Sequence, residues 1–298
     1  MSIVLEQVGL LFIFMFCGYL FGKSKLVNYE HTKILSVLGI YMFLPCTVFN
    51  AFHTNFTLNN LTQYYMLFIV AIILLSVLVC ISYFASGLFS KDKYERNVYK
   101  YTLIISNYGY MGYALAQGLF GEEGLLYIIL FALPFSLFTY TFGYCMLTNR
   151  EISFKRLINP VIISIMVGAV FGILNLEIPF VIETFIKKSS NCMAPVSMLL
   201  TGITLSEFNI KELVSDKKVY IVSVVRLILI PGVVLVILRP FLDESIVRTA
   251  VLLCAMPCGL NTIIFPKLIG ASCRLGAKLA FVSNILALVS IPLVLNFI

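Results

Sequence analysis

Residues 254–270, "CAMPCGLNTIIFPKLIG", interrupt an apolar segment near the C-terminus of the chain. Pro257, Gly259, Asn261 and Pro266 stand where a continuous membrane helix would need strong helix formers, and glycine and proline are the weakest helix formers. An asparagine buried without a hydrogen-bond partner is also costly. The pattern predicts a helix that is broken near its centre, and it raises the question of what the break is for.

The composition around this segment is that of an integral membrane protein. Of the 298 residues, 60% are hydrophobic and 12% are charged, whereas an ordinary soluble domain carries about 25% charged residues. The whole chain, 1–298, is therefore expected to form a single membrane domain whose main partner is the lipid bilayer. The net charge of +7 is spread over short loops, a pattern typical of membrane topology and not of a nucleic-acid-binding face.

Spanning helices need about 20 mostly apolar residues, and this criterion predicts an all-α fold with ten spans. They cover residues 3–22, 32–52, 64–89, 98–119, 123–147, 157–175, 189–206, 218–239, 246–268 and 276–297. The stretch 178–188 is too short to cross, and we expect it to be a separate amphipathic segment at the membrane interface.

Lysine and arginine residues indicate the orientation of these spans. When alternate loops are assigned to one side, sixteen of the 21 basic residues fall on that side. Because basic loops stay in the cytoplasm, the pattern predicts a multi-pass protein of the cell membrane with both termini outside.

The loop at residues 148–156 divides the ten predicted spans into two sets of five. An odd number of spans per half means that the second half, 157–298, is inserted upside down relative to the first, 1–147, as in inverted-repeat transporters. Pro45 and Pro195 are 150 residues apart, as are Gly109 and Gly259. We interpret the two prolines as structural positions in the matching second and seventh spans.

The fourth span repeats the pattern of the ninth. Its sequence "IISNYGYMGYALAQGLFG" (104–121) places Asn107 and Gly109 at the centre. Irregular backbone within a membrane survives only against protein or a water-filled cavity, and paired interrupted spans mark a substrate site near the midplane. The alternative is that both breaks are kinks that ease packing. We predict a substrate-binding site formed by Asn107, Gly109, Tyr110, Pro257, Gly259, Asn261 and Arg226.

Arg226 enters this set because it lies about midway along the eighth span, where a charge is costly and usually faces a cavity or a partner. No Asp or Glu lies at the centre of a predicted span to neutralise it. Two readings stay open: Arg226 serves an anionic substrate, or its side chain reaches the cytoplasmic interface. No resident cofactor or metal site is predicted, and a coupling ion, H⁺ or Na⁺, is left open.

Five motifs, in order along the chain, resemble the auxin efflux carrier family. They are "LPCTVF" (44–49), "SNYGYMGYA" (106–114) with "GEEG" (121–124), Pro195 with Gly202 and Leu205, "RLILIP" (226–231), and "AMPCGLN" (255–261). The resemblance implies crossing broken helices four and nine, as in transporters of the NhaA and bile-acid-symporter type. It also implies elevator-like alternating access, a homodimer, and transport of small organic anions such as malate, malonate or auxin-like acids.

Three other functions are alternatives to an organic-anion carrier. A sodium-coupled symporter of the bile-acid type would share the fold, and sodium dependence of flux would identify it. An enzyme would need a nucleophile, an acid pair or a metal cluster at one depth, and the sequence suggests none. A channel is disfavoured because no repeated polar pore-lining face is visible.

Overall fold

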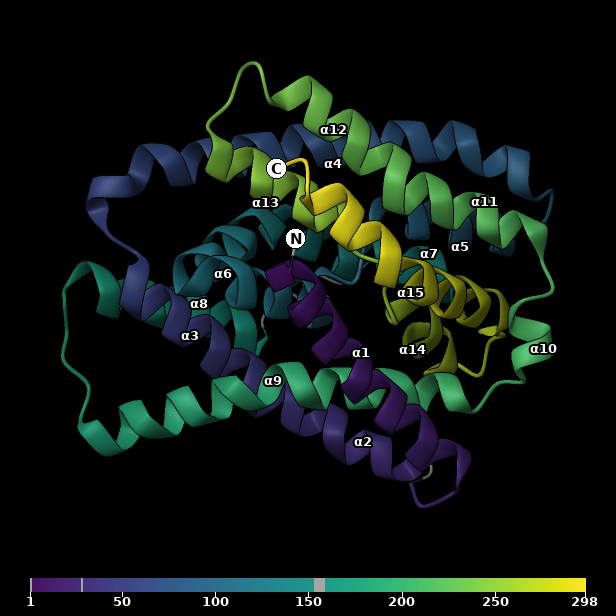
Figure 1. Ribbon diagram of the computed structural model, residues 1–298, viewed down its shortest axis with the longest axis horizontal. Helices are drawn as coiled ribbons and strands as arrows, with labels where there is room; N and C mark the ends of the chain where they lie inside the picture. Colours follow the sequence, from purple (N-terminus) through teal and green to yellow (C-terminus); the bar gives the residue numbers. More distant parts are fainter. Residues whose placement is uncertain (1, 28, 153–158) are drawn as a thin grey trace.

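The computed structural model describes residues 2–27, 29–152 and 159–298, and these residues form helices joined by short turns (Figure 1). The prediction of an all-helical membrane protein is confirmed. Lys155, Arg156 and the first two residues of the sixth predicted span, 157–158, lie outside the described residues.

Six helical stretches of the described chain are long and apolar enough to cross a membrane. They are Ile3–Lys23, Thr32–Asn55, Leu58–Phe89, Tyr108–Thr148, Lys217–Leu238 and Arg274–Leu295. The remaining predicted spans fall on helices that are shorter, more polar or interrupted. The individual elements are α1 (Ser2–Lys23), α2 (Tyr29–Leu38), α3 (Leu44–Asn55), α4 (Leu61–Phe89), α5 (Lys93–Ile104), α6 (Tyr113–Phe138), α7 (Tyr144–Thr148), α8 (Pro160–Ile173), α9 (Phe180–Ser206), α10 (Ile210–Leu213), α11 (Lys217–Val224), α12 (Ile230–Leu238), α13 (Glu244–Ala255), α14 (Asn261–Lys267) and α15 (Arg274–Leu295).

Two of the apolar stretches contain a wide π-helical turn directly before a proline. The turn η1 (Gly39–Phe43) precedes Pro45 in α3, and η6 (Val225–Leu229) precedes Pro231 in α12. A proline has no N–H and its ring clashes with the carbonyl four residues earlier, so the preceding turn widens to relieve the clash. The second of these turns carries Arg226.

The expectation of a separate interfacial segment at 178–188 is wrong. Helix α9 runs unbroken from Phe180 to Ser206, over 27 residues, or about 40 Å at 1.5 Å per residue. No glycine or proline interrupts it before Pro195, and Lys187 pairs with Glu183 one turn earlier at 2.6 Å. The segment is therefore the first part of the same helix as the seventh predicted span.

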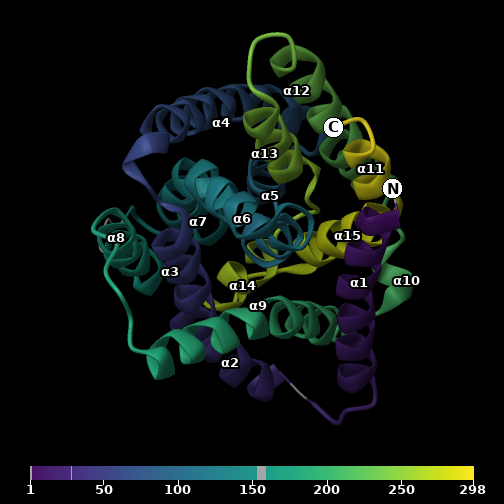
Figure 2. The same cartoon turned by 60° about the vertical axis from the view of Figure 1, so that its left-hand side comes forward.

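The helices pack as two groups. In the first group, α9 packs against α1, α2 and α3, and α3 packs against α8. In Figure 2, α2 and α9 lie at the bottom, α8 at the left and α1 at the right, whereas α4, α12 and α13 lie at the top with α5, α6 and α15 below them. Glycines allow α1 and α9 to touch: a Cβ placed on Gly18 or Gly202 would overlap the backbone of the other helix. The predicted structural prolines, Pro45 and Pro195, belong to α3 and α9 of the first group.

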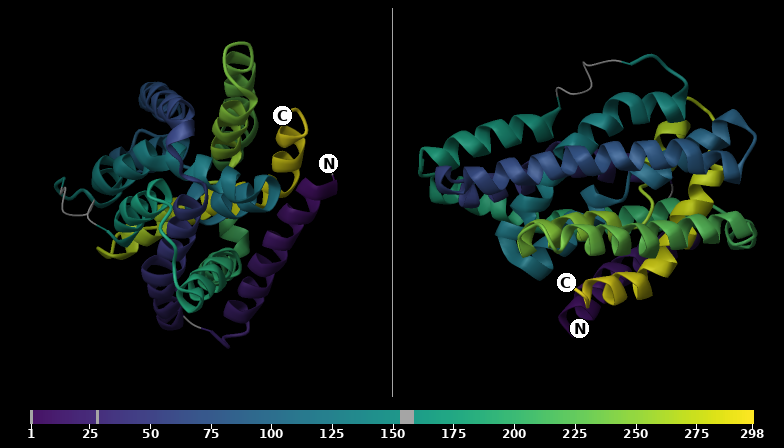
Figure 3. Two further views of the ribbon diagram at one scale, coloured as in Figure 1. Left: turned by 90° about the vertical axis from the view of Figure 1, so that its left-hand side faces the viewer. Right: turned by 90° about the horizontal axis from the view of Figure 1, so that it is seen from above.

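The two ends of the chain lie near each other, and Figure 3 shows this from two further directions. Helix α1 contacts α15, which carries the C-terminus.

Candidate functional site

The breaks in the fourth and ninth predicted spans lie against each other. Ser106 and Cys258 form an isolated antiparallel β-bridge, and the backbone N–H of Asn107 donates to the carbonyl of Pro257 at 2.8 Å. The backbone N–H of Cys258 donates to Ser283 Oγ at 3.0 Å. Backbone groups freed by each break are thus satisfied by the other break and by α15, which is how irregular backbone persists inside a membrane protein.

Local sequence explains where the helices stop. Helix α5 ends at Ile104 and α13 ends at Ala255, and Met256 adopts an extended conformation with ψ of 146°. This conformation is the one favoured before a proline, here Pro257. Gly259 follows in the break and packs against the backbone of Ser106.

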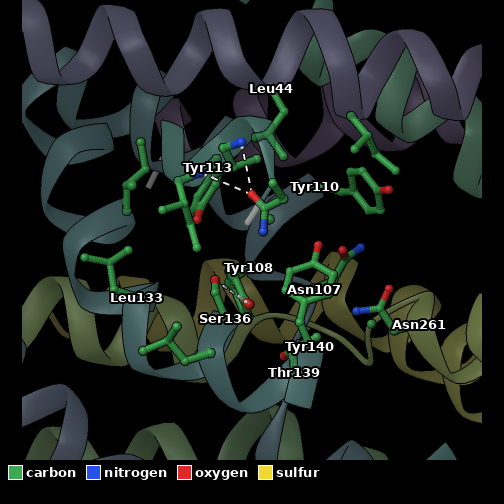
Figure 4. Close-up of a pocket in the computed structure, with 18 of the residues that line it drawn as sticks. Leu44, Asn107, Tyr108, Tyr110, Tyr113, Leu133, Ser136, Thr139, Tyr140 and Asn261 are labelled. Atoms are coloured by element: carbon green, nitrogen blue, oxygen red, sulfur yellow. Dashed lines mark hydrogen bonds between the residues drawn. The ribbon is translucent and has the colours of Figure 1, made fainter. Parts of the chain in front are cut away.

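A cavity of about 100 Å³ lies beside the paired breaks. Figure 4 shows Asn107, Tyr140 and Asn261 on the side of the cavity away from Leu133. Its lining consists of Ile40, Leu44, Ser106, Asn107, Tyr108, Gly109, Tyr110, Tyr113, Ile129, Leu133, Ser136, Leu137, Thr139, Tyr140, Asn159, Val161, Ile162, Ile165, Gly259, Leu260 and Asn261. The lining contains four tyrosines and no charged side chain.

Both helix groups contribute to this lining. Leu44 comes from α3 and Ile162 and Ile165 from α8, in the first group, whereas the paired breaks and α6 belong to the second. The cavity therefore lies at the boundary between the two groups. A change in their relative position would alter access to it.

Asn107 is the polar side chain best placed to bind a ligand here. It lines the cavity and is 3% exposed, and its Nδ2 has no hydrogen-bond partner among the described residues. A buried donor without a partner is costly. The arrangement favours a ligand that supplies an acceptor oxygen to this nitrogen.

Other polar groups around the cavity are held in place by one another. Asn261 Nδ2 donates to Tyr101 Oη at 3.0 Å, and Tyr108 Oη lies 2.9 Å from Ser136 Oγ. Tyr101 is itself fully buried. These bonds fix the directions in which Asn261 and Tyr108 face the cavity.

The structure brings together five of the seven residues predicted for the substrate site. Asn107, Gly109, Tyr110, Gly259 and Asn261 line the cavity. Pro257 does not line it, but its carbonyl holds Asn107 in place.

Arg226, the seventh residue, lies elsewhere. Its side chain is 0% exposed and does not line the cavity, and its Nη1 donates to the carbonyl of Leu103 at 3.1 Å. The side chain ends inside the protein instead of reaching a membrane interface.

Sequence reasoning missed several polar residues of the lining, among them Ser136, Thr139, Tyr140 and Asn159. Asn159 Oδ1 accepts hydrogen bonds from the N–H groups of Val161 and Ile162 and so caps α8. The pair Asn159–Pro160 is a recognisable helix start. That signal locates the helix end but does not indicate that it borders a cavity. Among the residues that the structure describes, no group of three His, Cys, Asp or Glu side chains could hold a metal ion.

Comparison with known proteins gives one family. The family model described as membrane transport protein matches residues 3–156 and 150–295. The chain is 25% identical to a transporter of Methanocaldococcus jannaschii, over 98% of this chain and 97% of that protein. It is 22% identical to a transporter of Methanothermobacter thermautotrophicus, over 97% of this chain and 96% of that protein. Both relatives are named as uncharacterized transporters.

Proposed function

Since the chain belongs to the membrane transport protein family, that of the auxin efflux carriers, we propose that it is a secondary transporter that carries small organic anions across the cell membrane. The substrates are carboxylates such as malate, malonate or auxin-like acids. The cavity beside the paired breaks is the substrate site, and the protein works by alternating access. Membership of a transport family implies transport and not catalysis.

The unpartnered Nδ2 of Asn107 carries this proposal. A carboxylate oxygen is an acceptor that would satisfy this buried donor. A helical stretch begins next to it at Tyr108 and runs to the break at Gly121, and the first turn of a helix presents free N–H groups and the positive end of the helix dipole. Neutral donors at a helix start can hold an anion without a cationic side chain.

The remaining lining suits the rest of such a substrate. Tyr110, Tyr113, Leu133 and Ile165 offer aromatic and aliphatic surface to a carbon skeleton. Ligand sites of this kind combine a mostly apolar wall with a few convergent polar groups.

Alternating access is supported by the two helix groups that share the cavity lining. In this proposal the group that contains the paired breaks moves as a unit, in an elevator-like manner, against the group formed by α1, α2, α3, α8 and α9. The ten crossings form two inverted repeats of five, with both termini outside and the basic loops in the cytoplasm. The protein acts as a homodimer through the first group.

Flux in proteoliposomes tests the proposal. Labelled malate, malonate and indole-3-acetate would be offered under an imposed membrane potential, with and without sodium, to the native protein and to Asn107→Ala. Asn59→Ala is the matched control, because Asn59 is exposed in the short 3₁₀ helix Leu58–Asn60.

We expect sodium-independent flux of at least one anion that Asn107→Ala abolishes and Asn59→Ala leaves unchanged. Flux that requires sodium would instead establish the symporter alternative. Absence of flux for every anion would refute the substrate class, and equal flux in both variants would refute the site.

A further inference from the structure

Arg226 is the largest fully buried side chain of the described protein, and it does not line the cavity. It lies in the π-helical turn η6 between α11 and α12. No carboxylate of the described residues pairs with it. A buried cation without a counter-charge is costly, so its surroundings must compensate for it in another way.

The guanidinium lies where two half-helices end. Its Nη1 donates to the carbonyl of Leu103, in the last turn of α5. The turn that carries it, η6, also packs against α13, whose last turn ends at the other break.

These helix ends supply the missing negative charge. The last turn of a helix carries unpaired carbonyls and a partial charge of about −0.5. Helices α5 and α13 both end at the bridge, so together they present about one negative charge, which a single guanidinium balances. Ser106 Oγ also donates to the carbonyl of Leu253 at 2.7 Å and so caps the second helix end directly.

Arg226 does not reach the cavity. The cavity lining includes Ser106, Asn107 and Gly259 of the two breaks, but it does not include Arg226. The Arg226 side chain is fully buried and donates to the carbonyl of Leu103, three residues before Ser106. Arg226 therefore contacts the helix end that leads into the break and not the cavity itself.

We propose that Arg226 is a positioning residue that holds the C-terminal ends of α5 and α13 together and thereby fixes the paired breaks, without contacting the substrate. The role concerns the geometry of the site and rests on the proposed function only in that the cavity it shapes is the transport site. Two other nitrogens of Arg226, Nε and Nη2, are buried and have no hydrogen-bond partner in the described protein.

A disulfide reporter tests this role without any substrate. The hydrogen bond of this bridge joins the neighbouring residues, Asn107 N and Pro257 O, and not Ser106 and Cys258 themselves. In antiparallel pairs of this kind the two opposite Cα atoms lie about 4.5 Å apart. That spacing lies within the range of disulfides. In Ser106→Cys protein treated with a copper–phenanthroline oxidant, the bond between position 106 and Cys258 would be quantified by mass spectrometry.

The reporter is combined with Arg226→Met, which removes the charge, and Arg226→Lys, which keeps it. We expect Arg226→Met to slow cross-linking by at least about tenfold, equivalent to about 1.4 kcal/mol, and Arg226→Lys to restore most of the rate. The maximal rate of flux should decrease for every transported anion, whereas the substrate concentration at half-maximal flux should change little.

Unchanged cross-linking in Arg226→Met overturns the proposal, whether or not flux is lost. A selective rise in the half-maximal concentration with a native cross-linking rate would show instead that Arg226 attracts the substrate. If Arg226→Met cannot be purified as folded protein, Arg226→Lys is measured alone. This variant keeps the positive charge, so loss of the cross-link in folded Arg226→Lys protein would refute the role proposed for that charge. If Arg226→Met slows cross-linking as expected but the protein with Arg226 intact carries no anion, only the proposed function is refuted.

Discussion

The backbone N–H of Asn107 donates a 2.8 Å hydrogen bond to the carbonyl of Pro257, a residue 150 positions away. This bond joins the breaks in two helices that are far apart in the sequence. It leaves the Asn107 side chain in the cavity with a free Nδ2. A backbone contact thus determines where this side chain lies in the cavity.

Replacing Asn107 with aspartate should abolish anion transport. Asn107→Asp keeps the shape of the side chain but exchanges its donor nitrogen for an acceptor and adds a negative charge in a buried site, where like charges repel strongly. We expect anion flux to fall by at least about a hundredfold, or about 2.7 kcal/mol, in the liposome assay. A variant that still carries anions at the native rate would remove Asn107 from the site.

Removing the hydroxyl of Tyr101 should weaken substrate binding without unfolding the protein. Tyr101 Oη accepts the 3.0 Å hydrogen bond that orients Asn261, and one such bond is worth about 1 kcal/mol. Tyr101→Phe should raise the substrate concentration at half-maximal flux about fivefold. Tyr41→Phe is the control, because Tyr41 is 66% exposed. Equal behaviour of both variants would mean that Asn261 does not need this orientation.

The cavity should prefer an apolar monocarboxylate over a compact dicarboxylate. It is lined by four tyrosines and no charged side chain, so a second carboxylate would be desolvated without a cationic partner. In competition against one labelled anion, indole-3-acetate should inhibit uptake at lower concentration than malonate. Stronger inhibition by malonate would indicate that a different cavity shape is used during transport.

Contact between α1 and α9 should be sensitive to a single methyl group. A Cβ at Gly202 would overlap backbone atoms of Met15 and Tyr19, whereas a Cβ at Gly232 meets nothing within 4 Å. Both glycines are helical, and alanine improves helix propensity at each by about 1 kcal/mol. Gly202→Ala should therefore lower the thermal transition of purified protein by several degrees, while Gly232→Ala leaves it equal or higher. Equal transitions would contradict the close approach of α1 and α9.

Glu122 should help to hold the two helix groups in the observed arrangement. Its carboxylate accepts hydrogen bonds from Asn50 Nδ2 of α3 at 3.1 Å and from Gln117 Nε2 of α6 at 2.7 Å. Glu122→Ala removes the acceptor for both amides, and charged hydrogen bonds contribute about 1.5–3 kcal/mol each. Labelling of Ala51→Cys, at the neighbouring fully buried position of α3, by a water-soluble maleimide should become faster in this variant. Glu177→Ala, at an exposed carboxylate in the turn before α9, is the control.

Sequence patterns were sufficient for the helical membrane architecture and for the positions of the breaks. Lipid requires every backbone group to be satisfied within the segment, so apolar runs of spanning length predict helices. Pro257 and Gly259 mark the interruption of the ninth predicted span by their own conformational limits. These properties depend on neighbouring residues alone, and five of the seven residues selected in this way line one cavity.

Tertiary structure decided what the patterns could not. The sequence gives no signal that Asn159 borders the cavity or that Arg226 donates to the end of α5. Both facts depend on which distant segments of the chain meet. A charged residue within an apolar run gives the same sequence pattern whether it faces a ligand, a lipid headgroup or the carbonyls of a distant helix. Only the packing of the helices determines which of these groups compensates the charge.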